Sequence, residues 1–222
     1  MDDATWALVR HNLWPMLKAT LTTTLPLTAI TFVVGLAIAL FVALARMSDN
    51  RLLSAAARFY ISLIRGTPLL VQLFIIFYGL PAFDIVIDPF PAAVIAFSLN
   101  VGGYAAEIIR ASILSVDRGQ WEASYAVGMS YPQALRMIIL PQGARIAVPP
   151  LSNTLISLVK DTSLASTILV TELLRTAQMA AAPTFDFFAL YGVAAIYYWV
   201  ICLILGFGQS GLESVLARHV AR

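Results

Sequence analysis

Charged side chains stand inside one of the long apolar stretches of this 222-residue chain, where a lipid bilayer would normally exclude them. Lys160 and Asp161 are adjacent, and Thr162 follows them. An ammonium and a carboxylate at one level of a membrane could bind the carboxylate and the ammonium of a free amino acid. A structural charge pair explains the same two residues almost as well. Because a charge within a membrane helix costs about 2.5–3.5 kcal/mol on insertion scales, we treat these three residues as part of a candidate substrate pathway.

Polar residues recur at helical spacing in two of the apolar stretches, so each stretch would have one polar face. A face of this kind cannot point to lipid. It must point to the other polar face, to a partner subunit or to a water-filled pathway. Glu107 could instead form a local ion pair with Arg110, three residues further on. The two sets, which we add to the candidate substrate pathway, are Asn100, Tyr104 and Glu107, and Asn153, Ser157 and Lys160.

The composition excludes most soluble functions. Hydrophobic residues make up 60% of the chain and charged residues 12%, and the mean hydropathy is +0.84. Soluble domains have about 25% charged residues, so most of this exterior must face lipid. The net charge of +2 is too small to indicate a nucleic-acid partner. We therefore expect an all-α membrane protein.

Neither a catalytic centre nor a metal site can be assembled from the sequence. The two histidines, His11 and His219, stand near opposite ends, and Cys202 is the single cysteine. A nucleophile, a base and an orienting group that could meet are missing, and so is a cysteine cluster for a metal. We expect no enzyme activity, no metal and no cofactor bound by this chain.

Five apolar stretches are long enough to cross about 30 Å of hydrocarbon, which takes roughly 20 helical residues. The second is interrupted by Arg65, Gly66, Thr67 and Pro68. Because Pro68 disfavours helical geometry at Thr67, we expect a broken or kinked helix there; Arg65 could simply extend to the membrane surface. The five predicted spans cover residues 19–45, 59–80, 90–109, 146–170 and 187–208.

Basic residues are distributed unevenly between the connections, and this predicts the orientation of the chain. Arginines occur in the connections 46–58 and 110–145 and after the last span, whereas the connection 81–89 has no basic residue. Basic residues mark the cytoplasmic side, so the N-terminus would be outside and the C-terminus in the cytoplasm. Arg10 and Lys18 oppose this orientation but are outnumbered.

The connection of about residues 112–145 is the longest segment outside the predicted spans. Asp117 would cap a short helix, and Gly128 would follow it in a left-handed conformation. Ser130 would cap a second short helix that Pro141 stops. A plain connector needs only about 2–8 residues, so we expect this segment to present a surface to a partner.

Sequence motifs recur along nearly the whole chain. They include Arg65-Gly66-Thr67-Pro68, Glu122-Ala123-Ser124, Gly128, Leu140-Pro141 and Lys160-Asp161-Thr162-Ser163. The motifs in the connection just described have the spacing of the EAA motif of ATP-binding-cassette (ABC) importer permeases, with a serine in place of the second alanine. Together with the motifs in the second and fourth spans, they make the chain resemble the polar amino-acid ABC permeases, which are type I importers, and within them the L-cystine permease subunits.

The resemblance implies a fold, partners and a location. The chain would be a single transmembrane permease domain over residues 1–222, with the type I importer fold, in a bacterial inner membrane. Its partners would be a second permease subunit, a dimer of ABC ATPases that holds ATP and Mg, and an extracytoplasmic solute-binding protein; its substrate would be a polar amino acid. The second permease subunit would be an identical copy, although some relatives pair two different chains and the sequence leaves both arrangements open. The residues that would couple the loop to the ATPase are Glu122, Ala123, Ser124, Gly128, Leu140 and Pro141.

A different class of function stays open on the residues alone. A membrane anchor, or a channel-like subunit of an energy-converting complex, would also be apolar and multi-pass. Such a subunit would not depend on the connection 112–145, whereas a permease coupled to an ATPase would.

Overall fold

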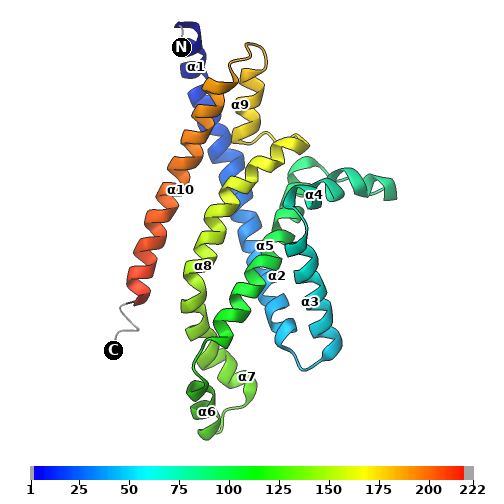
Figure 1. The fold of residues 1–222 in the computed structure, drawn as a ribbon, viewed down its shortest axis with the longest axis vertical. Helices are drawn as coiled ribbons and strands as arrows, with labels where there is room; N and C mark the ends of the chain where they lie inside the picture. Colours follow the sequence, from blue (N-terminus) through cyan, green and yellow to red (C-terminus); the bar gives the residue numbers. More distant parts are fainter. Residues whose placement is uncertain (1–2, 218–222) are drawn as a thin grey trace.

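The computed structural model describes residues 3–217, and every regular element within them is helical (Figure 1). The all-α prediction is therefore confirmed for this part; His219 and the arginines after the last span lie outside it. The elements, with η marking a π- or 3-10-helical segment, are α1 (Asp3–Ala19), η1 (Thr20–Thr24), α2 (Leu25–Met47), α3 (Arg51–Gly66), α4 (Leu69–Phe74), η2 (Ile75–Gly79), η3 (Leu80–Phe83), α5 (Pro89–Leu114), α6 (Arg118–Ala126), α7 (Tyr131–Ala134), η4 (Leu135–Ile139), α8 (Leu140–Asp161), η5 (Thr162–Ile168), α9 (Leu173–Ala181) and α10 (Phe187–Ala217).

The first helix is much longer than the predicted span. α1, the π-helical segment η1 and α2 run without a break from Asp3 to Met47, a length of 45 residues. Threonine hydroxyls in and after the π turn bond to backbone carbonyls four residues earlier. The prediction missed residues 3–18 of this helix because Arg10 and Lys18 interrupt the apolar run. Charged residues end an apolar run, but they do not prevent a helix from forming.

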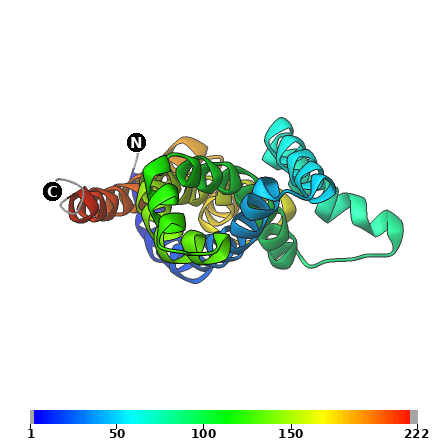
Figure 2. The ribbon, with the colours of Figure 1, turned by 90° about the horizontal axis from the view of Figure 1, so that it is seen from below.

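Two helices of the bundle are broken. α3 and the segment from α4 to η3 meet at 105°, with Thr67 and Pro68 between them. The predicted break is confirmed, and its cause is local, since proline has no N–H to continue the helix. Beyond it, α4 to η3 project sideways from the bundle (Figure 1; Figure 2). The helix that ends with η5 meets α9 at a smaller bend of 48°, after Leu169 in a left-handed conformation (φ 68°).

The number of membrane crossings depends on how these broken pairs are counted. Three helices of the described part are by themselves long and apolar enough to cross: Asp3–Met47, Pro89–Leu114 and Phe187–Val215. Counting each bent pair as one crossing raises the number to 5, which is the predicted number.

The prediction that Pro141 ends the second loop helix is wrong. α7, η4 and α8 form one helix that passes through Pro141 and continues to Asp161. The π turn η4 lies directly before the proline, and there the N–H of Leu140 bonds to the carbonyl of Leu135, five residues back. This wider turn moves the carbonyl that a proline ring would otherwise meet, so the helix can continue.

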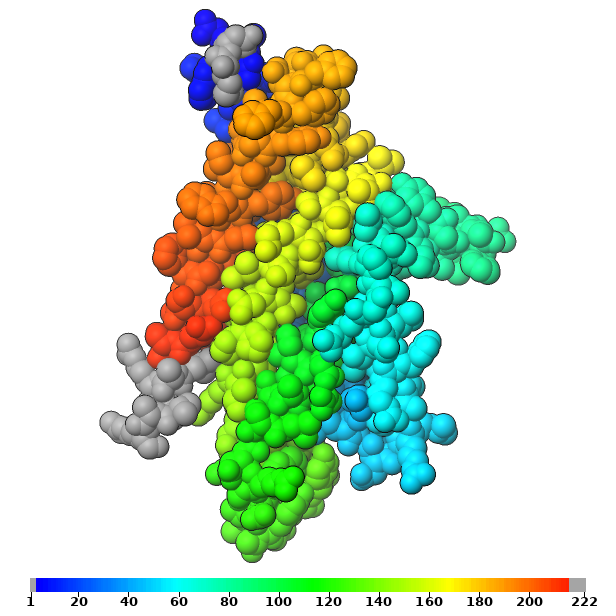
Figure 3. Space-filling view, viewed as in Figure 1, coloured from blue at the N-terminus to red at the C-terminus, as the bar shows by residue number. Residues whose placement is uncertain are grey.

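Glycines allow the central helices to approach closely. α5 packs against both α2 and α3. A Cβ atom on Gly35 of α2 would lie 2.6 Å from Cβ of Val101, and one on Gly103 of α5 would lie 2.5 Å from Cγ2 of Ile64. In lipid, where apolar burial gives little gain, this close packing is a main source of helix association. α10 differs, because it lies along the outside of the bundle with most of its surface uncovered (Figure 3).

Gly35→Ala should destabilise the bundle by about 1–3 kcal/mol, because the added methyl group has no room beside Val101. Gly206→Ala in α10 is the matched control, since a Cβ atom there meets nothing within 4 Å. The measurement is the thermal unfolding midpoint of the detergent-purified protein. Equal midpoints for the two variants would contradict close packing at Gly35.

Candidate functional site

A cavity of about 680 Å³, with polar and apolar residues in its wall, lies among the α3–α4 break, α5 and α8. Its volume is in the range of small-molecule sites, about 300–1,000 Å³. Six of the eight residues predicted for a substrate pathway line it, three from α5 and three from α8. The polar residues of its wall are Arg65, Thr67, Asn100, Tyr104, Glu107, Asn153, Thr154, Ser157 and Asp161.

The other two predicted pathway residues lie apart from this cavity. The Lys160 side chain is exposed but does not line the wall. Thr162 is fully buried, and its hydroxyl donates to the carbonyl of Val159 at 2.6 Å. The adjacent pair Lys160–Asp161 is therefore divided, and only Asp161 faces the cavity.

A glutamine satisfies the broken end of α3 beside the cavity. Nε2 of Gln72 donates to the carbonyl of Ile64 at 2.9 Å and to Oγ1 of Thr67 at 2.9 Å. Its Oε1 accepts a hydrogen bond from Nδ2 of Asn100 at 3.0 Å. Asn100 thus ties α5 to the break as well as lining the cavity. Sequence reasoning missed this role of Gln72, for which the available signal was an amide side chain one turn after a Thr-Pro break.

The charges in the cavity wall are not all neutralised. Glu107 forms the local ion pair with Arg110 that we weighed as its alternative role, with Arg110 Nε donating to Glu107 Oε1 at 3.0 Å. The guanidinium carbon of Arg65 lies 5.7 Å from the centre of the Tyr104 ring, a cation–π contact. In the described part of the chain, neither Arg65 nor Asp161 takes part in an ion pair. The wall therefore presents one cation and one anion that a ligand could pair with.

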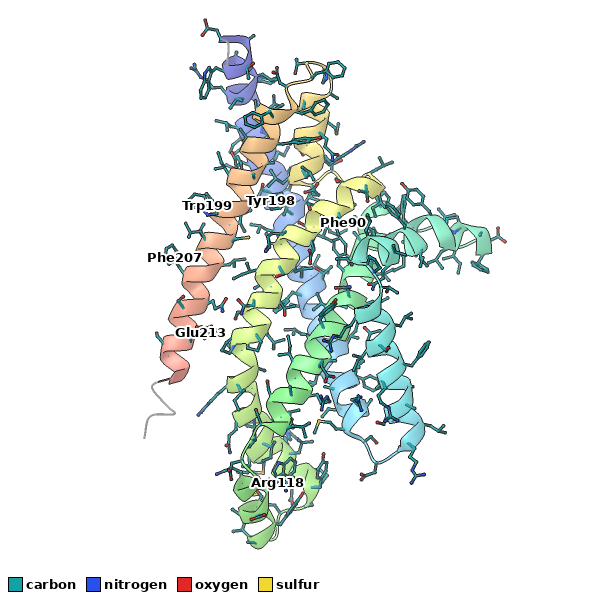
Figure 4. All side chains as sticks on the ribbon, viewed as in Figure 1. Phe90, Arg118, Tyr198, Trp199, Phe207 and Glu213 are labelled. Carbon is teal, nitrogen blue, oxygen red and sulfur yellow. The ribbon has the colours of Figure 1, made fainter. Side chains whose placement is uncertain are left out.

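The second break, before α9, is capped by a buried acid that sequence reasoning also missed. Glu172 has no exposed surface, and its carboxylate accepts the N–H groups of Leu174 at 2.8 Å and Arg175 at 2.7 Å. Tyr198, which Figure 4 labels on α10, donates its hydroxyl to the same carboxylate at 2.7 Å. A glutamate directly before a helical run was the available signal. Its partner on α10, however, could not be predicted from local sequence.

At the far end of the bundle, α6 and α7 form a short hairpin (Figure 1), which we call the α6–α7 hairpin (residues 117–139). Asp117 caps α6, since its Oδ1 accepts the N–H of Gly119 at 2.7 Å. Gly128 follows α6 with φ +81°, and the N–H of Met129 donates to the Ser124 carbonyl at 3.1 Å. These are features of a Schellman motif, so the predicted left-handed glycine is confirmed.

The α6–α7 hairpin is joined to the long helices by an apolar base. Ile113, Val116 and Ile139 are buried there, and Trp121 and Leu140 pack against them. The amide of Gln142 also donates to the side-chain oxygen of Gln120 at 2.9 Å, which links α8 to α6. The hairpin is thus attached firmly to α5 and α8, the helices that line the cavity.

The residues of the predicted coupling motif divide between the hairpin surface and its base. Glu122, Ala123, Gly128 and Pro141 are exposed. Ser124 is buried, and its hydroxyl donates to a backbone carbonyl four residues earlier at 2.6 Å. The surface also exposes several large apolar side chains that a partner could cover, namely Tyr125, Val127, Tyr131 and Met137.

A protein-family model described as "Binding-protein-dependent transport system inner membrane component" matches residues 35–217, which include the cavity and the hairpin. The chain belongs to this family. It is therefore a permease subunit of an ABC transporter and not an enzyme, since ATP is hydrolysed by a separate subunit. Membership also implies an ATPase and a binding protein as partners, and it sets aside the alternative of an anchor or channel-like subunit.

Curated relatives resemble the permease over nearly its full length. The L-cystine transport system permease protein TcyB of Bacillus subtilis (strain 168) is 56% identical over 98% of this chain and 93% of its own length. The arginine transport system permease protein ArtQ of the same organism is 36% identical over 92% of this chain and 94% of its own.

Solved structures confirm the type I ABC permease fold. The structure titled as an amino acid ABC transporter with histidines has a TM-score of 0.89 and 36% identity, covering 96% of this chain and 99% of the other. An inward-facing MetNI methionine ABC transporter matches with a TM-score of 0.71 at 17% identity, over 97% and 99% of the two chains, and supports the fold alone.

Gly128→Val should reduce both ATPase association and uptake by the permease. A β-branched residue at φ +81° is strained by about 1–2 kcal/mol, on the order of a tenfold change in the population of the native hairpin. Gly128→Asn is the matched control, because asparagine tolerates a left-handed conformation. ATPase co-purification and transport should fall only for the valine variant; unchanged association and uptake would show that the hairpin is not the ATPase contact.

Proposed function

We propose that this permease imports a polar amino acid, with L-cystine as the first candidate. The observation that carries the proposal is the 56% identity to the Bacillus subtilis L-cystine permease over 98% of the chain. The relative named for arginine is much less similar, at 36% identity. Arginine and other polar amino acids are therefore the competitors against which cystine has to be tested.

The charges of the cavity support a zwitterionic substrate. An amino acid carries a carboxylate that Arg65 could bind and an ammonium that Asp161 could bind. Both charged residues line the cavity, and neither is used in an ion pair within the described chain. In this proposal Asn153 and Ser157 add hydrogen bonds from α8, and Lys160 lies outside the contact set. Glu107 is already paired with Arg110 and shapes the wall instead.

The proposed complex contains a second, identical permease subunit, an ATPase dimer that holds ATP and Mg, and an extracytoplasmic solute-binding protein. Membership of the family supports the ATPase and the binding protein, and the second permease subunit is proposed from the resemblance to the polar amino-acid permeases. The whole chain, residues 1–222, acts as one permease domain in a bacterial inner membrane.

The orientation we propose puts the N-terminus outside and the α6–α7 hairpin in the cytoplasm. Basic residues support it, because they gather toward the hairpin end of the helices, where the positive-inside rule expects the cytoplasm. These residues are Arg46, Arg51, Arg58, Arg118, Arg136 and Arg145. The hairpin would then insert into the ATPase. The small side chain of Ala123 would allow a close approach, and the charge of Glu122 would fix the position of the hairpin on the ATPase surface.

The transporter, reconstituted with its ATPase and binding protein in proteoliposomes, should accumulate radiolabelled L-cystine in an ATP-dependent way. Excess unlabelled cystine should compete fully, and excess arginine, histidine or glutamine should compete weakly. Accumulation of arginine but not cystine would reject cystine while leaving amino-acid import intact. No accumulation of any amino acid would reject the proposed function.

Asp161→Asn should lower uptake by at least about tenfold, because the neutral amide loses the charge that would bind the substrate ammonium, and a charge-assisted hydrogen bond contributes about 1.5–3 kcal/mol. Lys160→Met, at the neighbouring position outside the cavity, is the matched control and should have a smaller effect. Assembly with the ATPase is measured in parallel for both variants. A larger loss of uptake for Lys160→Met would contradict the assignment of Asp161.

A further inference from the structure

The outer end of the first helix carries a face of alternating aromatic and basic residues that the transport function does not use. Trp6, Arg10, Trp14 and Lys18 follow one another at intervals of four residues on α1. Trp6 is 49% exposed and Trp14 is 67% exposed, and both basic side chains are exposed. Because residues four apart are neighbours on a helix, the four form one continuous face, which we call the Trp–basic face.

The opposite face of α1 is the one that the protein covers. Val9 and Met16 are buried in a cluster with residues of α9 and α10. The hydroxyl of Tyr197 on α10 donates to the carbonyl of Leu13 at 3.0 Å. The Trp–basic face therefore points away from α9 and α10. In the described part of the chain, neither Arg10 nor Lys18 forms an ion pair.

The length of the uncharged part of the first helix places Lys18 at the boundary between lipid and water. The 27 residues between Lys18 and Arg46 carry no charge. As a helix they measure about 40 Å, the thickness of a bilayer with its headgroups, so Lys18 and Arg46 fall in opposite headgroup layers. The Trp–basic face thus begins where the apolar run of the first helix ends.

The chemistry of the face matches that of an anionic headgroup layer. Tryptophan concentrates at membrane interfaces, since its ring is apolar and its N–H is polar. Arginine and lysine near an anionic surface are each attracted by about 1 kcal/mol. These two basic residues also oppose the positive-inside distribution of the rest of the chain, and a ligand phosphate would offset that cost.

We propose that the Trp–basic face of α1 binds the headgroups of anionic phospholipids at the end of the bundle remote from the α6–α7 hairpin (Figure 1). Lys18 and Arg10 pair with lipid phosphates, and the ring of Trp14 packs against the headgroups between them. Bound lipid holds α1 at a fixed depth in the membrane. Because the opposite face of α1 packs against α9 and α10, the lipid also fixes the position of these two helices.

The test uses the purified transporter complex in nanodiscs of phosphatidylcholine with increasing phosphatidylglycerol. Phosphatidylglycerol retained by the permease is measured by native mass spectrometry. The variant R10Q/K18Q should lower the apparent affinity roughly 20- to 30-fold, because each basic side chain contributes about a fivefold factor. The variant R10K/K18R keeps both charges and should bind as the unchanged protein does. Both variants are first checked for an unchanged thermal midpoint in pure phosphatidylcholine.

Three results would overturn the proposal. The first is equal phosphatidylglycerol binding by R10Q/K18Q and the unchanged protein. The second is an equal loss of binding in R10K/K18R, which would mean that charge is not responsible. The third is retention of phosphatidylcholine by the unchanged protein as strongly as of phosphatidylglycerol, which would mean that the face does not select anionic headgroups.

Discussion

Each broken helix in this bundle leaves backbone N–H or C=O groups without helical partners. The structure depends on two side chains that form hydrogen bonds with these groups. Lipid supplies no hydrogen bonds, so an open N–H or C=O group there costs several kcal/mol. Gln72 bonds the carbonyl of Ile64 at the end of α3, and Glu172 bonds the first N–H groups of α9. These two contacts supply hydrogen bonds that lipid could not, and so they stabilise both breaks.

The same two side chains also connect the breaks to helices distant in sequence. Gln72 accepts a hydrogen bond from Asn100 of α5, and Glu172 accepts one from Tyr198 of α10. The N–H of Leu173 donates to Oγ1 of Thr24, in the π turn of the first helix, at 3.1 Å. A polar residue that caps a break therefore also fixes the packing of the helix that binds it, and the cavity forms beside the first of these junctions.

Features of this fold could be predicted from the sequence where they are set by residues close together in the chain, and not where they depend on residues far apart. The break at Pro68, the left-handed Gly128 and the cap at Asp117 are set by a few neighbouring residues, and all three were predictable. Pro141 misled the prediction, because a π turn directly before it lets the helix continue. The fold family followed from motif order along the chain. The position of the cavity did not, since it depends on the angle at which α3 and α4 meet.

The candidate site shows the same division. Helical spacing placed Asn100, Tyr104 and Glu107 on one face, and all three line one cavity. The same rule grouped Lys160 with Asn153 and Ser157, but Lys160 lies outside that wall, near the point where α8 gives way to a 3-10 segment. The residues of α8 that line the wall still follow helical spacing, but the face they form is centred on Thr154, Ser157 and Asp161, so Lys160 lies beyond its edge.

The unbroken first helix has a mechanical consequence. With 45 residues it is about 67 Å long, and it runs from the end of the bundle remote from the hairpin towards the hairpin end (Figure 1). A rigid rod of that length acts as a lever. A tilt of roughly 10° about its midpoint would carry its two ends about 6 Å in opposite directions. One small rotation is thus enough to widen the bundle on one side of a membrane while narrowing it on the other.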